Sequence, residues 1–176
     1  MTRQMTRKGY KQTELGEIPE DWSYVPIGRL TENIIDYRGL TPRKLGMDWG
    51  GGAIAALSAG NVKKGYIDLE AESYLGSEAL YKKWMRNGHA RQGDIAFTME
   101  APLGNAALIP DERKYILSQR TILLQFDSTS INSRYVFQLV NSNSFQKSIA
   151  DKATGSTAQG IKRSTFEQIK LQLPSL

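Results

Sequence analysis

The residues of this chain that are best suited to catalysis are a few acidic side chains in its central part. The run Pro110-Asp111-Glu112-Arg113-Lys114 superficially matches the acids and lysine with which some nucleases hold a metal ion and support an attacking water. In that chemistry the acids are separated, whereas here they are adjacent, and a Pro-Asp pair favours a turn. We therefore interpret the run as a hairpin loop between two strands. A metal-dependent nuclease that uses Asp94, Glu100 or the Asp111/Glu112 pair is kept as the alternative.

Other catalytic patterns are missing from the sequence. No Gly-x-Gly loop follows a strand, no Asn/Asp-Pro-Pro-Tyr/Phe motif of a methyltransferase occurs, and there is no Walker A sequence. His89 is the only histidine and cysteine is absent, so neither a histidine-based nor a thiolate metal site is expected. His89 follows a glycine in a polar stretch, which is typical of a turn. The sequence therefore predicts a binding protein, with no cofactor, no metal and no enzymatic activity.

Several loops carry residues that suit a polyanion. The long stretch 36–52 has Gly, Pro and charge but no periodicity, and loops of this length are often functional. It offers side chains for phosphate and base-edge contacts, namely Tyr37, Arg38, Thr41, Arg43 and Lys44. Lys63-Lys64 follow a polar turn, and Arg120 follows Ser118-Gln119 just before a strand. Each feature alone is typical of a solvated surface, but together, without a catalytic centre, they favour DNA binding.

The C-terminal segment combines a loop of small polar residues with two cations. Residues 154–160 read TGSTAQG, and Lys162-Arg163 follow. Ser164 and Glu167 have the spacing of a capping box, which predicts a helix of about two turns from Thr165 that Pro174 ends. Exposed backbone N–H groups beside positive charge suit a phosphate. A structural connection with a well-made cap is an equally good interpretation.

Composition and charge limit the classes of protein to which the chain can belong. The 176 residues carry a net charge of +5, and positive charge collects in residues 1–11 and in residues 101–176. This distribution is consistent with a nucleic-acid partner. No apolar run approaches the roughly 20 residues that a membrane span needs. Together with the lack of cysteine, this favours a protein of the cytoplasm that does not bind a membrane.

The hydrophobic pattern predicts an α+β fold, in which a mixed, mainly antiparallel sheet packs with several short helices. Residues 15–22 read as an ordered turn. Helices are predicted over 26–34, 78–86 and 132–150, the last with a break at 141–144. Strands are predicted over 53–57, 66–69 (pairing back), 94–99, 105–109 and 121–126.

Five segments of the sequence resemble a known family. They are residues 15–30, 56–68, 93–109 (GDIAFTMEAPLGNAALI), 117–124 and 153–176, and the third and fifth are the most specific. Their order and spacing are similar to those of a target recognition domain from the specificity (S) subunit of type I restriction-modification systems.

The resemblance implies a non-catalytic subunit that reads one half of a bipartite target in double-stranded DNA. It implies methyltransferase (M) subunits as partners and, through them, the restriction (R) subunit, and a second specificity half-subunit is a further candidate. The variable stretches 36–52, 60–66 and 83–92 then become the expected base-contacting parts, which adds Arg86 and Arg91 to the DNA-binding candidates. The C-terminal motif is expected to face a spacer helix or a partner through Gly155, Ser156, Thr157, Gln159, Lys162 and Arg163. A protein-docking module with little DNA contact is the remaining alternative.

Length is the departure from the family pattern. Residues 1–12 read as a flexible basic segment and residues 13–176 as a single recognition domain, so a spacer helix and a second recognition domain are missing. We expect the chain to be a natural half-subunit, the product of a shortened gene, or a piece cut at a domain boundary.

Overall fold

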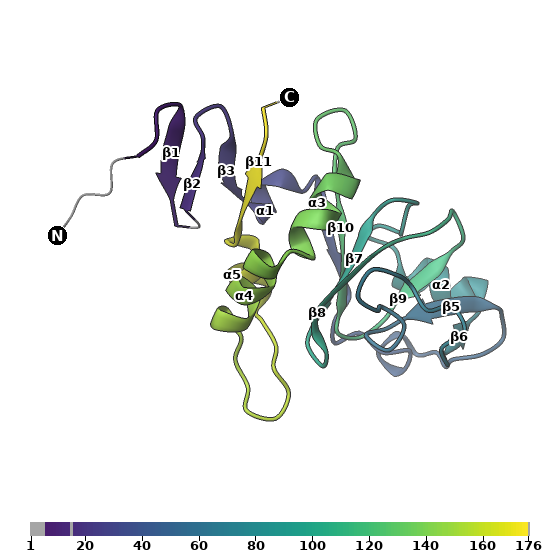
Figure 1. Ribbon diagram of the computed structural model, residues 1–176. Coiled ribbons are helices and arrows are strands. Elements are labelled where there is room, and N and C mark those ends of the chain that lie inside the picture. Colours follow the sequence, from purple (N-terminus) through teal and green to yellow (C-terminus); the bar gives the residue numbers. More distant parts are fainter. Residues whose placement is uncertain (1–5, 15, 176) are drawn as a thin grey trace.

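The computed structural model describes residues 6–14 and 16–175 (Figure 1). The strands are β1 (Tyr10–Thr13), β2 (Gly16–Pro19), β3 (Ser23–Pro26), β4 (Asn33–Asp36), β5 (Ile54–Leu57), β6 (Leu75–Gly76), β7 (Ile95–Met99), β8 (Leu103–Leu108), β9 (Tyr115–Leu117), β10 (Thr121–Gln125) and β11 (Lys170–Leu173). The helices are α1 (Ile27–Leu30), the 3-10 turn η1 (Arg43–Leu45), α2 (Glu78–Trp84), α3 (Ser133–Val140), α4 (Asn143–Lys152) and α5 (Arg163–Glu167).

The central layer is an antiparallel sheet with the strand order β4-β10-β7-β8. Successive side chains of a strand point to opposite faces. Phe97 and Ile122 therefore join one hydrophobic cluster, and Ala96 and Leu123 join the other. Because both faces are covered, β7 and β10 are buried along their whole length. This explains why their sequences are continuously apolar rather than alternating.

The two faces of the sheet are covered by different units. On one face, α3, α4 and α5 enclose the rings of Phe97, Phe145 and Phe166, whose centroids lie 4.9 to 6.3 Å apart. On the other face lies a three-stranded sheet, β6-β5-β9, with α2 beside it. The pairs β1-β2 and β3-β11 form two small ribbons away from that second sheet (Figure 1).

The structure confirms the α+β class and several predicted elements. Ser77 caps α2, since its hydroxyl accepts a hydrogen bond from the Leu80 backbone N–H at 3.1 Å. The predicted break separates α3 from α4 at residues 141–142. β7 and β8 pair around the Pro102 corner, and β10 lies where the β-branched run predicts a strand.

Four predictions for the first half of the chain are wrong. Residues 10–12 belong to β1, which pairs with β2, so order begins before the predicted boundary at 13, and the turn over 15–22 contains β2 (Leu15 lies outside the described residues). The helix over 26–34 ends at Leu30, because Ile34 and its neighbour must extend to fill the two faces of the sheet. β5 pairs with β6 and β9 and not with residues 66–69, where Ile67 bridges to Val62.

Two further predictions fail in the second half. Residues 110–114 do not form a hairpin, because β8 and β9 belong to different sheets, and β9 pairs in parallel with β5. The capping box is absent: α5 begins at Arg163 without a side-chain cap, and Glu167 accepts a hydrogen bond from Arg163 Nε at 2.6 Å. The following residues 170–173 form β11 rather than helix, because pairing with β3 satisfies their backbone.

None of the helices in the described part of the chain has the length and apolar character needed to cross a membrane.

Candidate nucleic-acid interface

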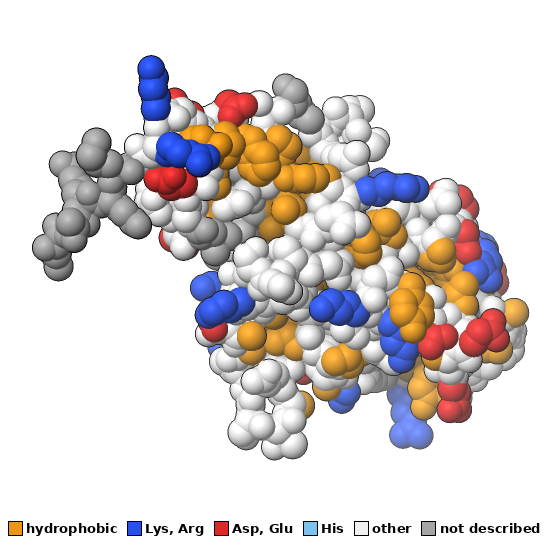
Figure 2. Space-filling view, viewed as in Figure 1, with side chains coloured by type: hydrophobic (Ala, Val, Ile, Leu, Met, Phe, Trp, Pro, Cys, Tyr) orange, Lys and Arg blue, Asp and Glu red, His pale blue; other side chains and the backbone are white. Residues whose placement is uncertain are grey.

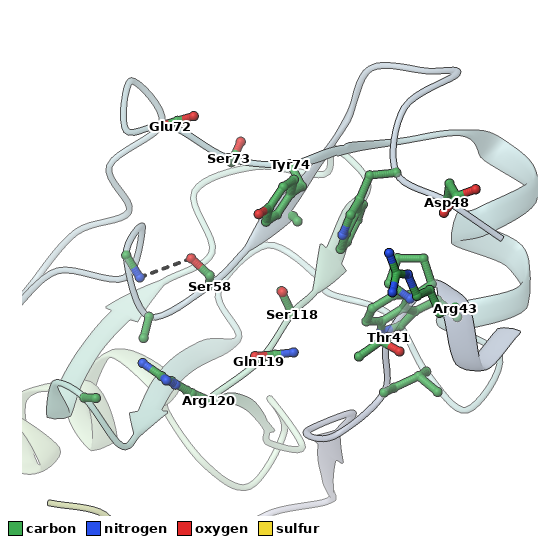
Figure 3. A pocket seen from close by; sticks show the side chains of 18 residues that line it. Thr41, Arg43, Asp48, Ser58, Glu72, Ser73, Tyr74, Ser118, Gln119 and Arg120 are labelled. Atoms are coloured by element: carbon green, nitrogen blue, oxygen red, sulfur yellow. Dashed lines mark hydrogen bonds between the residues drawn. The ribbon is translucent and has the colours of Figure 1, made fainter. Parts of the chain in front are cut away.

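A groove of about 960 Å³ lies where several distant segments of the chain meet (Figure 3). We call it the aromatic groove. Its walls come from the loop 40–49, the turn 58–60, the segment 72–74 and the segment 118–120. Three of these walls adjoin the second sheet, since residues 58–60 follow β5, residues 72–74 precede β6, and residues 118–120 connect β9 to β10, while the loop 40–49 lies between β4 and β5. A site of this kind is therefore assembled by strand pairing rather than by sequence proximity.

Aromatic rings form one wall of the groove. Trp49 stacks on Tyr74 with ring centroids 5.2 Å apart and planes at 11°, and it contacts Trp84 at 5.3 Å. The indole N–H of Trp84 donates a hydrogen bond to the Leu117 carbonyl at 3.1 Å. Tyr74 is 66% exposed and is the most exposed large hydrophobic side chain among the described residues. The stack is thus anchored in the core at one end and open to solvent at the other.

Charged and polar groups surround these rings. Arg43 and Arg120 lie on opposite sides of the groove, and Asp48 and Glu72 also line it (Figure 3). Ser58 is already engaged, since its hydroxyl donates a hydrogen bond to Asn61 Oδ1 at 2.9 Å and accepts one from the Gly60 N–H at 3.1 Å. The lining is therefore mixed in charge and rich in hydrogen-bonding groups.

A second, smaller hollow of about 410 Å³ has a more basic lining, and we call it the basic hollow. Arg38, Lys162 and Arg163 line it together with Glu100 and the strand-like bridge between Thr154 and Gly160. Arg38 is held by Asp36, to which its Nε and Nη2 donate hydrogen bonds at 2.9 and 2.7 Å. Burial raises the pKa of the Asp36 carboxyl, but the hydrogen bonds and charge of Arg38 more than offset this, so that pKa lies below its ordinary value.

The two hollows adjoin each other. Glu100 lines the basic hollow and forms an ion pair with Arg120 of the aromatic groove at 3.6 Å, while Ala101 lines the groove. Ala101 and Arg120 are the only non-glycine residues with positive φ in the described chain, at 38° and 69°. Backbone strain of this kind is often found at functional sites. We call the two hollows together the binding strip.

The structure brings some of the predicted residues into the binding strip and leaves others outside it. Thr41 and Arg43 line the aromatic groove, and Arg38, Lys162 and Arg163 line the basic hollow. Tyr37 is buried, and its hydroxyl donates a hydrogen bond to the Gly88 carbonyl and accepts one from the Asn87 N–H. These hydrogen bonds tie Tyr37 to the turn that follows α2.

The remaining predicted DNA-binding residues lie outside the binding strip. Lys44 donates a hydrogen bond to the Gly39 carbonyl at 2.6 Å, and Lys63 and Lys64 extend the turn beyond the groove. Arg86 follows α2 and is exposed. Arg91 pairs with Glu32 at 3.6 Å, beside the Gln125 end of β10, whereas Arg120 precedes the other end of that strand.

The loop with Gly155, Ser156, Thr157 and Gln159 is closed by two backbone hydrogen bonds of 2.9 Å between Thr154 and Gly160. In Figure 1 this loop and β11 point to opposite ends of the molecule. Its contacts are with the Glu100–Ala101 corner, through the bridge to Gly160 and the hydrogen bond from the Ala101 N–H to the Gln159 carbonyl. The loop therefore borders the binding strip.

Sequence reasoning missed the aromatic wall. Trp49, Tyr74 and Trp84 are 10 or more residues apart, so no local pattern joins them. Tyr74 follows the run Glu70-Ala71-Glu72-Ser73, in which acidic and small residues alternate. An isolated aromatic residue in such a polar run is the sequence signal that could have pointed to the wall.

The acids of the nuclease alternative are engaged in separate places. Asp94 is buried, accepts hydrogen bonds from Gln125 Nε2 at 2.6 Å and from the Arg91 N–H at 2.8 Å, and burial raises its pKa. Glu100 pairs with Arg120. In the described residues no three of the potential ligands His, Cys, Asp and Glu are grouped in a way that could hold a metal ion.

Asp111 provides a test of local electrostatics. The hydrogen bond from the Arg113 side chain lowers the pKa of Asp111 to about 2, from an ordinary 3.8. A carboxyl with a lowered folded-state pKa contributes stability above its unfolded pKa, and this contribution is lost as the pH falls toward the folded value. Asp111→Asn is expected to cost at most about 1 kcal/mol at pH 7, because the pair is solvent-exposed, with the deficit disappearing between pH 4 and pH 2. Urea unfolding at pH 7, 4, 3 and 2 measures this.

Glu112→Gln is the matched control, because it removes the same charge from the neighbouring residue, which makes no hydrogen bond or ion pair with described residues. A deficit for Asp111→Asn that grows toward pH 2 would contradict the assignment.

The comparison with known families covers nearly the whole chain. A family model described as "Type I restriction modification DNA specificity domain" matches residues 19–176. The chain belongs to this family. The matched range contains both hollows of the binding strip, and it confirms the resemblance seen in the sequence.

Curated relatives agree with this membership. The chain is 27% identical to the type I restriction enzyme MjaVIII specificity subunit of Methanocaldococcus jannaschii, over 96% of this chain and 39% of that protein. It is 26% identical to the MjaIX specificity subunit of the same organism, over 94% and 37%. The chain therefore spans about two-fifths of the length of these relatives.

Solved structures show the same fold in this specificity family. The S subunit of a type I restriction-modification system from M. genitalium aligns with a TM-score of 0.56 at 14% identity, over 88% of this chain and 34% of that one. The HsdS subunit from Thermoanaerobacter tengcongensis aligns with a TM-score of 0.61 at 13% identity, over 95% and 36%.

Proposed function

We propose that the chain is a non-catalytic DNA-reading module of a type I restriction-modification system. It reads one half of a bipartite target in double-stranded DNA, in the cytoplasm, and positions methyltransferase subunits and, through them, the restriction subunit. The observation that carries the proposal is the family match over residues 19–176. A second specificity half-subunit would supply the other half of the target.

The binding strip supports this function. Phosphate contacts fix the position of a protein on DNA, and contacts with bases supply specificity. The basic hollow suits the first task, since Arg38, Lys162 and Arg163 gather there. The adjoining aromatic groove has the guanidinium, amide and carboxylate groups that suit the second.

The opposite end of the molecule suits a protein partner. Hydrophobic side chains gather over the part of the surface formed by β1, β2, β3 and β11 (Figure 2). Exposed apolar patches often mark protein interaction sites. We place the contact with the methyltransferase subunits at this end, which leaves the binding strip open to DNA.

Salt-dependent binding tests the DNA-reading function. Arg43 and Lys162 lie in the two hollows, and neither side chain makes an ion pair or hydrogen bond with described residues. The double variant Arg43→Gln/Lys162→Gln is expected to bind a mixed-sequence duplex about tenfold more weakly. The slope of log K against log salt should fall by about 2, because about one counterion is released per phosphate contact. Fluorescence anisotropy on labelled duplex at 50 to 200 mM salt gives both values.

The matched control is Arg29→Gln/Arg134→Gln, which removes the same charge from exposed positions on α1 and α3. This control should keep the wild-type slope. Equal losses in the two double variants would show a general charge effect. No loss in either would favour the protein-docking alternative, and metal-dependent cleavage of the duplex would favour a nuclease.

A further inference from the structure

The aromatic groove is concave, and this shape restricts which part of DNA enters it. Its floor includes Trp84 and Ser118, which are 1% and 7% exposed. In an intact duplex the base edges lie about 8.5 Å deep in the major groove, where only a protruding protein element reaches them. A group that reaches the floor of the aromatic groove must itself project from the DNA. The sugar–phosphate backbone projects, and so does a base that has left the helical stack.

The charges of the lining favour a base over a phosphate. Arg43 and Arg120 are balanced by Asp48 and Glu72, so a phosphate in this groove would meet two carboxylates. In the basic hollow beside it, Arg38 and Arg163 are paired with Asp36 and Glu167, whereas Lys162 makes no ion pair with the described residues and is free to contact a phosphate. Carboxylates accept hydrogen bonds from the amino groups of bases, and guanidinium groups donate to their ring nitrogens and carbonyls.

The aromatic wall offers an open stacking surface. Trp49 covers one face of the Tyr74 ring, yet Tyr74 remains 66% exposed, so its other face is open to solvent. Trp49 in turn rests on the buried Trp84, which holds the stack in place. Bases of any sequence stack on such rings, because every base has a π face.

Unpaired polar groups lie beside this surface. The Ser118 hydroxyl points into the groove (Figure 3) and makes no hydrogen bond with described residues, although the residue is only 7% exposed. The Gln119 amide, which also lines the groove, has no such bond either. Gln119 is exposed, so neither group has to break a hydrogen bond with the described residues before it contacts a ligand. The edge of a base supplies both donors and acceptors.

We infer that the aromatic groove holds a nucleobase that lies outside the double-helical stack, packed on Tyr74 with Ser118 and Gln119 at its edge. This inference rests on the proposed function, because DNA brought by the basic hollow delivers the base. An unpaired base comes either from a duplex, as an extruded base, or from a single strand. In both cases the group that enters the groove is a nucleobase.

Three labelled DNAs of one sequence test the inference at a single salt concentration: the paired duplex, the duplex with one unpaired adenine, and the single strand. The wild-type chain is expected to bind the duplex with the unpaired adenine about tenfold more tightly than the paired duplex, which is within the range that one base–aromatic stack supplies. Tyr74→Ala should remove this preference and keep the affinity for the paired duplex. Tyr74→Phe should retain it, because the ring remains.

Tyr66→Ala is the matched control, since Tyr66 is a second exposed tyrosine, at 58%, outside the groove lining. It should leave the preference unchanged, and thermal unfolding should show all variants folded. Equal binding of paired and unpaired duplexes by the wild type, or a preference that survives in Tyr74→Ala, overturns the inference. If binding of the single strand depends on Tyr74, the base comes from single-stranded DNA. If it does not, the base is one that is extruded from a duplex.

A probe without a duplex separates this inference from the proposed function. Deoxyadenosine monophosphate at millimolar concentration should quench the fluorescence of Trp49 and Trp84, and Tyr74→Ala should reduce this quenching severalfold. If the chain binds no duplex at any salt concentration, the proposed function fails, while quenching by the nucleotide still reports on the groove. If the nucleotide causes no quenching in the wild type, the inference fails.

Discussion

Phe97→Ala is expected to lower the free energy of unfolding by about 3–5 kcal/mol, the usual cost of deleting a buried phenyl ring. Phe97 is fully buried in β7, between the neighbouring strands β8 and β10. Its ring lies 4.9 Å from that of Phe166 and 6.3 Å from that of Phe145. The substitution leaves a cavity that three separate elements support, so the cavity cannot collapse easily. Urea unfolding followed by circular dichroism gives the change.

Phe97→Leu keeps much of the volume and should lose clearly less stability than Phe97→Ala. The exposed Tyr66 is the external control, and Tyr66→Ala should stay within about 0.5 kcal/mol of the wild type. A loss below about 1.5 kcal/mol for Phe97→Ala would contradict the packing of the three rings.

Gly52→Ala is expected to destabilise the chain by about 1–3 kcal/mol, because it overpacks a contact between two backbones. A Cβ at residue 52 would lie 2.6 Å from the Gly76 carbonyl oxygen and 2.7 Å from Ser77 Cα. Neither atom belongs to a flexible side chain, so β6 and the start of α2 must shift. Because Ser77 caps α2 and Trp84 ends it, tryptophan fluorescence should change along with the urea midpoint.

Gly60→Ala is the comparison for this substitution. The nearest atom to a Cβ there is Ser58 Oγ at 3.3 Å, a contact that is relieved by a shift of a few tenths of an ångström. Its effect on stability should therefore be much smaller. Equal effects of the two substitutions would mean that the approach of residue 52 to β6 is not tight.

Elements with strong local signals follow from the sequence. The apolar run of β10 predicts a strand wherever it packs, and Ser77 predicts the start of α2 through its side-chain hydrogen bond. The polar residues Asn141 and Ser142 predict the break between α3 and α4 in the same way. In each case the deciding contact lies within a few residues.

Elements that depend on distant partners do not follow from the sequence. Residues 170–173 form a strand because β3, more than 140 residues earlier, offers its backbone for pairing. Ile34 keeps helical spacing with Ile27, yet it extends because β10 lies beside it. Local propensity is weak enough for such pairing to override it.

The candidate site also depends partly on residue types and partly on contacts between distant segments. The family pattern and the cations Arg38, Arg43, Lys162 and Arg163 are readable from the residues alone, and they determine that the chain is a specificity domain with DNA as its expected ligand. The tertiary structure alone decided which cations share one surface, and it placed Arg91 and Arg120 at opposite ends of β10. It also stacked Trp49 on Tyr74 beside Ser118. Residue type determines the chemistry available to the chain, whereas long-range pairing of β5, β6 and β9 determines which of these groups meet.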